Sequence, residues 1–237
     1  MRLKAVVLAA GEGTRLRSVL GDRPKPLLPV KGKPLIRHVI DGLASCGVSE
    51  VLVVVGYNAK SLIRFLKELR VPGLKVRWTL NDEYQRGNGV SLAKALLQAD
   101  EKLILTMSDH LFERRLLEAL IDEGEPLSLA VDRRPKYLRD IAEATKVLVS
   151  AEGYIVDIGK HVSRWNAVDT GFFIVDREFV ELAHRLSKSV HSLTLSDVVR
   201  STLRDKVFKA VDVTGCFWMD VDMSEDLMLA EAVLPGG

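Results

Sequence analysis

Short apolar runs alternate with amphipathic stretches through the first half of the chain. Residues 5–10 (AVVLAA) form an unbroken apolar run that ends in glycines, which is typical of a buried strand in a parallel sheet. The alternation continues along the chain as a helix over 34–46, a strand over 51–55, a helix over 61–69, a strand over 74–80, a helix over 90–97 and a strand over 103–107. Strands separated by helices of this length favour right-handed βαβ crossovers.

The pattern changes after about residue 127, where four strand-like segments follow with little helix between them. They cover 127–131, 144–149, 154–158 and 171–175. Such strands pair antiparallel or add a mixed edge to a sheet. Predicted helices over 178–186 and 196–203, a strand over 207–213 and a helix over 225–233 complete the chain. We therefore expect one α/β domain over 1–237, with a Rossmann-like, mixed, mainly parallel sheet flanked by helices.

Composition narrows the class of protein. The 34 basic and 32 acidic side chains nearly cancel, so no global field favours nucleic acid or an anionic membrane. The apolar runs are only strand-length, no secretory signal is recognisable, and Cys46 and Cys216 lie in no motif. We expect a cytoplasmic protein that acts on small molecules, binds no nucleic acid and inserts into no membrane. Only four Asn and two Gln occur, as in proteins from thermophiles. The oligomeric state stays open.

A glycine-rich, basic segment follows the first predicted strand, LAAGEGTRLR and then DRPKPLLPV. Gly11 and Gly13 allow a sharp bend that brings backbone N–H groups close to a ligand, as a phosphate-binding loop requires. Four cations lie within eleven residues after this turn: Arg15, Arg17, Arg23 and Lys25. The loop leaves the carboxyl end of a parallel strand, where open α/β sheets bind their ligands. The segment therefore predicts a triphosphate site.

Two other phosphate-binding motifs fit this segment poorly. The dinucleotide fingerprint needs a third glycine and an acidic residue about 20 positions further on. Arg15 and Leu16 follow Thr14 instead, and the second strand ends in VGYN without an acidic residue. No Gly-Lys-Ser/Thr follows either, so the P-loop pattern fails. These absences disfavour an NAD-dependent oxidoreductase.

Asp109 directly follows the strand over 103–107, at the sheet edge that carries the glycine loop. A single carboxylate beside nucleotide phosphates commonly serves Mg²⁺, which takes one or two protein ligands. The alternative is that Asp109 caps a helix that begins near Glu113. His110 is a neighbour of this site and receives no role.

Asp220 and Asp222 point to the same side of an extended segment near the C-terminus. Asp222 with Glu225 also matches a capping box that opens the last helix. We therefore predict Asp109 and Asp220 as metal ligands and keep Asp222 as the alternative to Asp220.

Together these residues resemble the sugar-1-phosphate nucleotidylyltransferases, over roughly residues 4–232. Within that superfamily, five segments are similar to the inositol-1-phosphate cytidylyltransferases: 84–92 (YQRGNGVSL), 107–110 (MSDH), 143–147 (EATKV), 158–160 (IGK) and 166–173 (NAVDTGFF). The resemblance implies a nucleotidyltransferase, GT-A-like fold. It also implies a nucleotide-binding half over about 1–126 and an acceptor-binding half over about 127–237.

The resemblance implies roles for individual residues. Arg15 and Lys25 would be the catalytic cations that stabilise the triphosphate, and Mg²⁺ would be the cofactor. The nucleotide would contact nine residues: Leu8, Ala9, Ala10, Gly11, Gly13, Thr14, Gly87, Asn88 and Ser91. The acceptor would contact six residues: Glu143, Lys146, Lys160, Asp169, Thr170 and Gly171. Lys160 would meet its phosphate. One departure is RSVL at 17–20, where many relatives carry Pro-Leu-Thr.

The implied reaction is cytidylyl transfer from CTP to 1L-myo-inositol-1-phosphate, giving CDP-inositol and pyrophosphate by Mg²⁺-assisted in-line attack on the α-phosphorus. Three alternatives stay open: a hexose-1-phosphate nucleotidylyltransferase that uses GTP, dTTP or UTP, a phosphocholine cytidylyltransferase, and a catalytically inactive nucleotide-binding subunit. Some members of the family continue into a membrane transferase domain. We therefore expect a separate membrane transferase as the partner that acts downstream.

Overall fold

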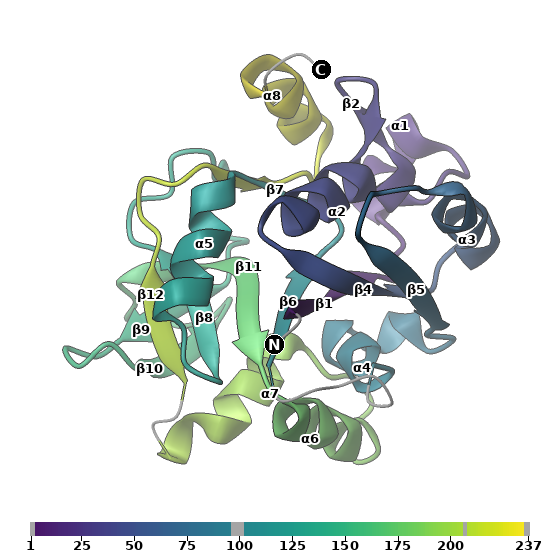
Figure 1. Cartoon of the computed structure of the whole chain (residues 1–237). Helices are drawn as coiled ribbons and strands as arrows, with labels where there is room; N and C mark the ends of the chain where they lie inside the picture. The colour runs from purple at the N-terminus through teal and green to yellow at the C-terminus, as the bar shows by residue number, and fades with distance from the viewer. Residues whose placement is uncertain (1–2, 96–101, 206–207, 235–237) are drawn as a thin grey trace.

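The structure is a computed structural model that describes residues 3–95, 102–205 and 208–234. A nine-stranded mixed sheet forms its middle layer (Figure 1). The strands are β1 (Leu3–Ala9), β4 (Val48–Val55), β5 (Lys75–Leu80), β6 (Leu103–Met107), β8 (Ser128–Asp132), β9 (Lys146–Val149), β10 (Ile155–Gly159), β11 (Ala167–Val175) and β12 (Lys209–Asp212). The main path is β10–β9–β11–β6–β1–β4–β5, with β8 beside β11 and β12 beside β8.

The strands of the first half are parallel, as the alternation of strands and helices predicts. β1 lies between β4 and β6, and β5 pairs with β4, all in parallel. In the second half, β11 runs antiparallel to β6, β8 and β9. The change follows from the connections, because strands that follow one another without a crossover helix turn back on themselves. The predicted fold class is confirmed.

Helices cover both faces of the sheet (Figure 1). One face carries α2 (Leu35–Ser45), α3 (Ala59–Glu68) and α5 (Arg114–Glu123), and the other carries α4 (Asn88–Ala93), α6 (Arg177–Ser187) and α7 (Leu195–Thr202). Along β1, Val6 and Leu8 enter the core beneath α4, α6 and α7. Val7 and Ala9 enter the opposite core. Both faces of β1 are buried from Ala5 to Ala9, which explains the unbroken apolar run there.

Several boundaries differ from those that the sequence predicts. The strand expected over 171–175 is β11, which already begins at Ala167. The helix expected over 90–97 is α4, which begins at Asn88 and ends at Ala93, and residues 96–97 lie outside the described residues. The strand expected over 207–213 is β12, and residue 207 also lies outside the described part. The strand expected to start at residue 144 starts at Lys146.

Two short strands bring the C-terminal segment to the end of β6. β7 (His110–Phe112) and β13 (Trp218–Asp220) form a separate antiparallel pair, in which Asp220 lies opposite His110. Beside them, α8 (Ser224–Val233) covers a small third core that includes Leu16, Leu28 and Met219. This core joins the glycine loop to the C-terminal segment, so their polar groups meet at one edge of the sheet.

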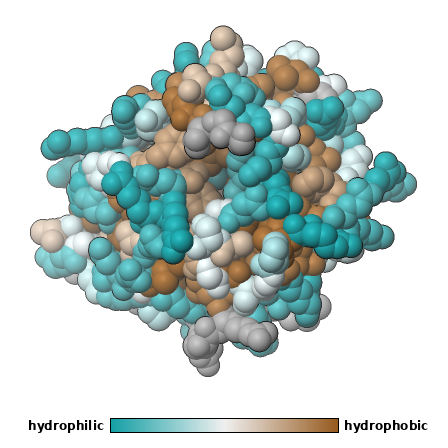
Figure 2. Space-filling view, turned by 45° about the horizontal axis from the view of Figure 1, so that its top comes forward, coloured by the Kyte–Doolittle hydropathy of each residue, from teal (hydrophilic) through white to brown (hydrophobic). Residues whose placement is uncertain are grey.

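The surface seen in Figure 2 is mostly hydrophilic, with apolar residues showing between the charged side chains. Within residues 3–95, 102–205 and 208–234, no helix has the length and apolar character needed to cross a membrane.

Candidate active site

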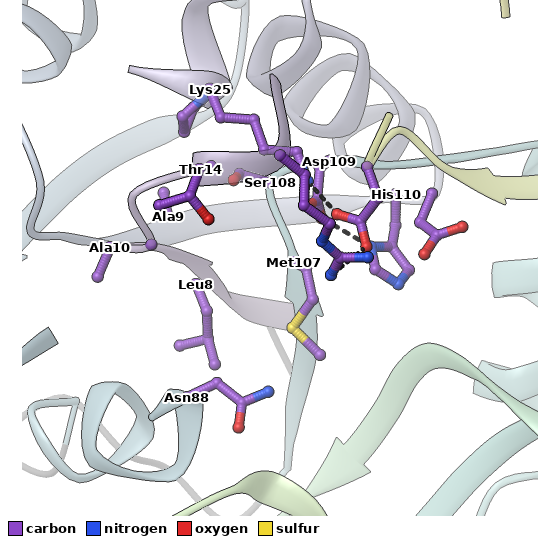
Figure 3. A pocket seen from close by; sticks show the side chains of 16 residues that line it. Leu8, Ala9, Ala10, Thr14, Lys25, Asn88, Met107, Ser108, Asp109 and His110 are labelled. Carbon is purple, nitrogen blue, oxygen red and sulfur yellow. Dashed lines mark hydrogen bonds and ion pairs between the residues drawn. The ribbon is translucent and has the colours of Figure 1, made fainter. Parts of the chain in front are cut away.

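The glycine loop forms one wall of a pocket of about 300 Å³ at the carboxyl ends of β1 and β6 (Figure 3). Gly13 has a φ of 63°, a left-handed conformation that a glycine adopts without strain. This turn starts the short helix η1 (Thr14–Leu16), whose Leu16 is buried and whose Arg15 faces the pocket. The Ala10 carbonyl accepts a hydrogen bond of 2.9 Å from Tyr57 N, which fastens the loop to the end of β4.

Twelve predicted site residues line this first pocket: Leu8, Ala9, Ala10, Gly11, Gly13, Thr14, Arg15, Lys25, Asn88, Asp109, Asp220 and Asp222. They come from the glycine loop, η2 (Lys25–Leu27), the start of α4, the end of β6 and the segment that begins with β13. Sequence positions more than 200 apart therefore contribute to one cavity.

Lys25 is the centre of the charge network in this pocket. Its ammonium lies 2.5 Å from Oδ2 of Asp109 and 2.5 Å from Oδ1 of Asp222, and only 8% of the residue is exposed. Burial opposes its charge, but the two carboxylates outweigh burial and raise the pKa of Lys25 above its ordinary value. Burial likewise works to raise the pKa of Asp109, yet Lys25 and His110 hold it well below its usual range. Both groups therefore stay charged.

The structure separates the roles of Asp220 and Asp222. Asp222 pairs with Lys25 and also with Arg15, whose Nη2 lies 3.0 Å from Oδ2. The Asp220 carboxylate faces both pockets and has no hydrogen-bond partner among the described residues. Burial raises the pKa of Asp220, and the neighbouring carboxylates Asp222 and Asp109 add to that effect against the opposing influence of His110.

The structure rules out the helix caps that the sequence offers as alternative roles for Asp109 and Asp222. Oδ2 of Asp226 accepts from the backbone N–H groups of Asp222 and Met223, so the capping carboxylate of α8 is Asp226 rather than the pair Asp222 and Glu225. The Asp222 side chain is held by Lys25 instead. Similarly, Asp109 does not cap α5, because Lys25 and His110 bind its carboxylate. In both cases a distant cation outcompetes a local backbone partner.

A second pocket of about 560 Å³ adjoins the first, and both are lined by Arg15, Asn88, Met107, His110, Asp220 and Asp222. Four predicted acceptor residues line this second pocket: Glu143, Lys160, Asp169 and Gly171. Lys160 Nζ lies 2.9 Å from Oε2 of Glu143, an exposed ion pair. Asp169 Oδ1 accepts from Gly171 N at 2.7 Å, and burial raises the pKa of Asp169 to about 6.

Four predicted site residues lie behind the pockets and do not line them. Lys146 Nζ donates to the carbonyls of Ala142 and Lys160, at 3.0 and 2.9 Å. Thr170 is fully buried and its Oγ1 donates to the Ala130 carbonyl. Ser91 Oγ accepts from Asn81 Nδ2. Gly87 packs against the Leu193 carbonyl. The side chains of Lys146, Thr170 and Ser91 therefore bind other parts of the protein and do not face either pocket.

Other lining residues were not found from the sequence. Leu138, Arg139 and Asp140, between β8 and β9, line the second pocket. His110 lines both pockets. Residues 138–140 carry no motif, so only their position beside the acceptor pocket identifies them. His110 lies within the MSDH segment, where its position beside Asp109 is the signal that the sequence offers.

Comparisons with known proteins identify the family of this chain. Residues 5–148 match the MobA-like NTP transferase domain. The chain is 36% identical, over 98% of its length, to the bifunctional IPC transferase and DIPP synthase of Archaeoglobus fulgidus, of which it covers 44%. It spans about half the length of the other bifunctional relatives of that name.

Solved structures are similar over nearly the whole chain. The inositol-1-phosphate CTP transferase from T. maritima superposes with a TM-score of 0.85 at 29% identity, and the match covers 98% of this chain and 97% of that one. A UDP-glucose pyrophosphorylase complexed with UDP-glucose has a TM-score of 0.80 at 19% identity, covers 98% of both chains and supports the fold alone. The predicted resemblance to nucleotidylyltransferases is confirmed. The chain belongs to the MobA-like NTP transferase family.

Proposed function

We propose that this protein transfers the cytidylyl group of CTP to 1L-myo-inositol-1-phosphate, releasing pyrophosphate and forming CDP-inositol. The observation that carries the proposal is the junction of the two pockets at Arg15, Asn88 and Asp222. A nucleotide in the first pocket and an acceptor in the second would meet there. The similarity to the inositol-1-phosphate CTP transferase supports the choice of base and acceptor.

The division of labour follows the lining of each pocket. The first pocket is formed mostly by residues before position 127, and the wall of the second that is not shared comes from later residues. We therefore assign nucleotide binding to about 1–126 and acceptor binding to about 127–237, with Asp220 and Asp222 as the exceptions. Both halves share one continuous sheet, as expected for a single domain.

The carboxylates at the junction fit a divalent cation. Hard cations such as Mg²⁺ prefer carboxylate oxygens and take only one or two from the protein when phosphates supply the rest. Asp109 and Asp220 would hold Mg²⁺. Asp220 is chosen over Asp222 because its carboxylate has no hydrogen-bond partner among the described residues, whereas Asp222 pairs with Lys25 and Arg15. Bound Mg²⁺ would supply neutralisation of phosphate charge.

The chain's own residues would provide the rest of the catalysis. A phosphate monoester is largely dianionic at neutral pH because its second pKa is about 6, so it needs no general base. One of its oxygens bonds to the α-phosphorus as the bond to the bridging oxygen of pyrophosphate breaks. Lys25 and Arg15 would offset the charge that accumulates at that point. Positioning and charge neutralisation therefore account for the rate.

The second pocket suits a polyol that carries one phosphate. Glu143 and Asp169 offer carboxylate oxygens that accept from hydroxyl groups, and Lys160 offers an ammonium for the phosphate. Lys146 would support this pocket from behind, because its ammonium binds carbonyls of the segment that carries Glu143 and of Lys160.

The absence of a membrane-spanning helix within the described residues is compatible with a cytoplasmic enzyme.

The test is pyrophosphate release over a matrix of substrates. CTP, UTP, GTP, dTTP and ATP are crossed with inositol-1-phosphate, glucose-1-phosphate, mannose-1-phosphate and phosphocholine, in the presence of Mg²⁺. A dominant signal for CTP with inositol-1-phosphate is the expected result. A signal with another pair would assign a sister activity to the same site. Nucleotide binding without turnover would favour a catalytically inactive subunit.

Two arginines of the glycine loop provide a matched pair of variants. Arg15 lines both pockets, whereas Arg17 faces Glu12 outside them. We expect Arg15→Gln to lower turnover by roughly 10²-fold and Arg17→Gln to leave it within about threefold. Asp109→Ala should also lower turnover by at least roughly 10²-fold. Equal effects of the two arginine variants would count against the proposed site.

A further inference from the structure

His110 lies between the two pockets and has no role in the mechanism above. Its side chain is 15% exposed, lines both pockets and belongs to β7, opposite Asp220 of β13. Its Nδ1 lies 2.8 Å from Oδ1 of Asp109. A single carboxylate thus uses both of its oxygens, because Oδ2 of Asp109 faces Lys25. Figure 3 shows His110 and Asp109 side by side at the pocket wall.

The donor in this contact is fixed by chemistry. Oδ2 of Asp109 accepts from the Lys25 ammonium at 2.5 Å, and a carboxylate paired with an ammonium only accepts hydrogen bonds. The proton between the two residues is therefore on Nδ1 of His110. A hydrogen bond from a neighbouring group fixes the rotation of a carboxylate, which determines where its remaining lone pairs point.

The fold also fixes the orientation of the imidazole ring. The ring lies directly against Gly171 of β11, where a Cβ atom would be 2.3 Å from Cδ2 and 2.4 Å from Nε2 of His110. Gly171 has a φ of 79°, which disfavours any other residue at this position. The ring also packs edge-on to Phe172, with ring centroids 6.2 Å apart. Gly171 thus provides room for His110 as well as lining the second pocket.

We propose that His110 is a positioning residue that orients the Asp109 carboxylate, through its Nδ1–H, for the binding of a divalent cation. The inference rests on the proposed cation site at Asp109. Nε2 of His110 has no part in this role. The residue acts through Asp109 and not through the nucleotide or the acceptor. It would therefore affect cation affinity while leaving metal-independent nucleotide binding unchanged.

Two substitutions separate the ring nitrogens. The side-chain amide of His110→Asn can place its nitrogen where Nδ1 lies, whereas that of His110→Gln reaches the position of Nε2. We expect Mn²⁺ binding to the enzyme with CTP, measured by electron paramagnetic resonance, to weaken about 10-fold or more in His110→Gln. In His110→Asn it should stay within about threefold of the unmodified protein. CTP affinity in the absence of metal should not change in either variant.

Each other result overturns the inference. Equal weakening in both variants would indicate a role of ring volume, and rescue by Gln alone would assign the role to Nε2. Normal Mn²⁺ binding in both would remove the role altogether. No Mn²⁺ binding by the unmodified protein would overturn the cation site as well, whereas the substrate matrix tests the choice of base and acceptor separately.

A measurement on the unmodified protein covers the case in which the variants do not fold. The nitrogen chemical shifts of His110, measured by ¹⁵N NMR, report which ring nitrogen carries the proton. A proton on Nδ1 is expected. A bare Nδ1 at neutral pH would contradict the hydrogen bond on which the inference depends.

Discussion

The Lys25 ammonium lies 2.5 Å from Oδ2 of Asp109, and this ion pair joins the segment after the glycine loop to the end of β6. The ammonium has a second carboxylate neighbour in Asp222, so one cation compensates two acidic groups. The arrangement keeps negative charges close together without a bound metal. It also places the Lys25 ammonium against the carboxylate that we assign to the divalent cation.

Replacement of Lys25 by methionine should make the protein depend on a divalent cation for stability. Lys25→Met leaves Asp109 and Asp222 without their shared cation, which should lower the free energy of unfolding by on the order of 3 kcal/mol. Because a cation that binds only the folded state stabilises it, millimolar Mg²⁺ should recover part of that loss. The measurement is the Tm with and without Mg²⁺.

The control for Lys25 is an exposed lysine of α3. Lys67→Met should leave both the Tm and its response to Mg²⁺ as in the unmodified protein. If Mg²⁺ raises the Tm of Lys25→Met by no more than that of this control, Asp109 does not belong to a cation site. Turnover of Lys25→Met should fall by at least roughly 10²-fold in either case, because Lys25 is also proposed to stabilise the triphosphate.

The sequence predicts the elements of this site better than the directions of its side chains. The glycine loop and Asp109 could be placed together because the carboxyl ends of parallel strands share one sheet edge. The motif alone could not show that Thr170 lies outside the acceptor pocket, whereas Asp169 and Gly171 line it. In β11 Thr170 lies between them and points to the opposite face, into the core.

Tertiary partners decided the remaining cases. Asp222 has the local sequence of a helix cap, yet Lys25 and Arg15 bind it. Lys146 carries a charge that suits an acceptor phosphate, yet two carbonyls bind its ammonium. For both residues the partner is set by the assembled fold, which the local sequence does not show.

Two buried threonines should respond oppositely to the same substitution. Thr106 and Thr170 are both fully buried, and the Thr106 hydroxyl has no hydrogen-bond partner among the described residues, whereas Thr170 donates to Ala130 at 2.8 Å. Thr106→Val removes an unsatisfied polar group at nearly constant volume and should raise the free energy of unfolding by about 1 kcal/mol. Thr170→Val should lower it by about 1 kcal/mol.

Urea unfolding of both variants checks this expectation, provided that the m-values match that of the unmodified protein. A loss of stability in Thr106→Val would mean that its hydroxyl finds a partner in solution, such as a buried water. Because neither threonine lines a pocket, turnover should stay unchanged in both.

Lys146 should affect the KM for the acceptor without contacting the acceptor itself. Its ammonium bridges the carbonyls of Ala142 and Lys160, so Lys146→Met releases the two segments that carry Glu143 and Lys160. We expect the KM for the acceptor to rise roughly tenfold, equivalent to about 1.4 kcal/mol, while the KM for CTP stays constant. Lys146→Arg should recover part of the effect, and Lys67→Met should show none. A parallel rise in the KM for CTP would indicate general loosening of the fold.

Asp169 should make stability fall as pH rises. Burial raises the pKa of Asp169 to about 6 in the folded protein, above the value of about 4 for an unfolded aspartate. Between these values the folded state holds a proton that the unfolded state has released. The contribution of Asp169 to stability is therefore lost as pH rises through this range, by on the order of 2 kcal/mol.

Asp169→Asn isolates this contribution, because asparagine keeps the shape and never ionises. The free energy of unfolding of Asp169→Asn should equal that of the unmodified protein below about pH 4 and exceed it by on the order of 2 kcal/mol above about pH 7. Asp122→Asn, at an exposed position of α5, should show no such divergence. A constant difference across the pH range would show that Asp169 ionises normally in the folded state. The same variant should weaken the binding of the acceptor, because we propose that Asp169 accepts hydrogen bonds from hydroxyl groups in the second pocket. That role would explain why a carboxylate is kept there at a cost in stability.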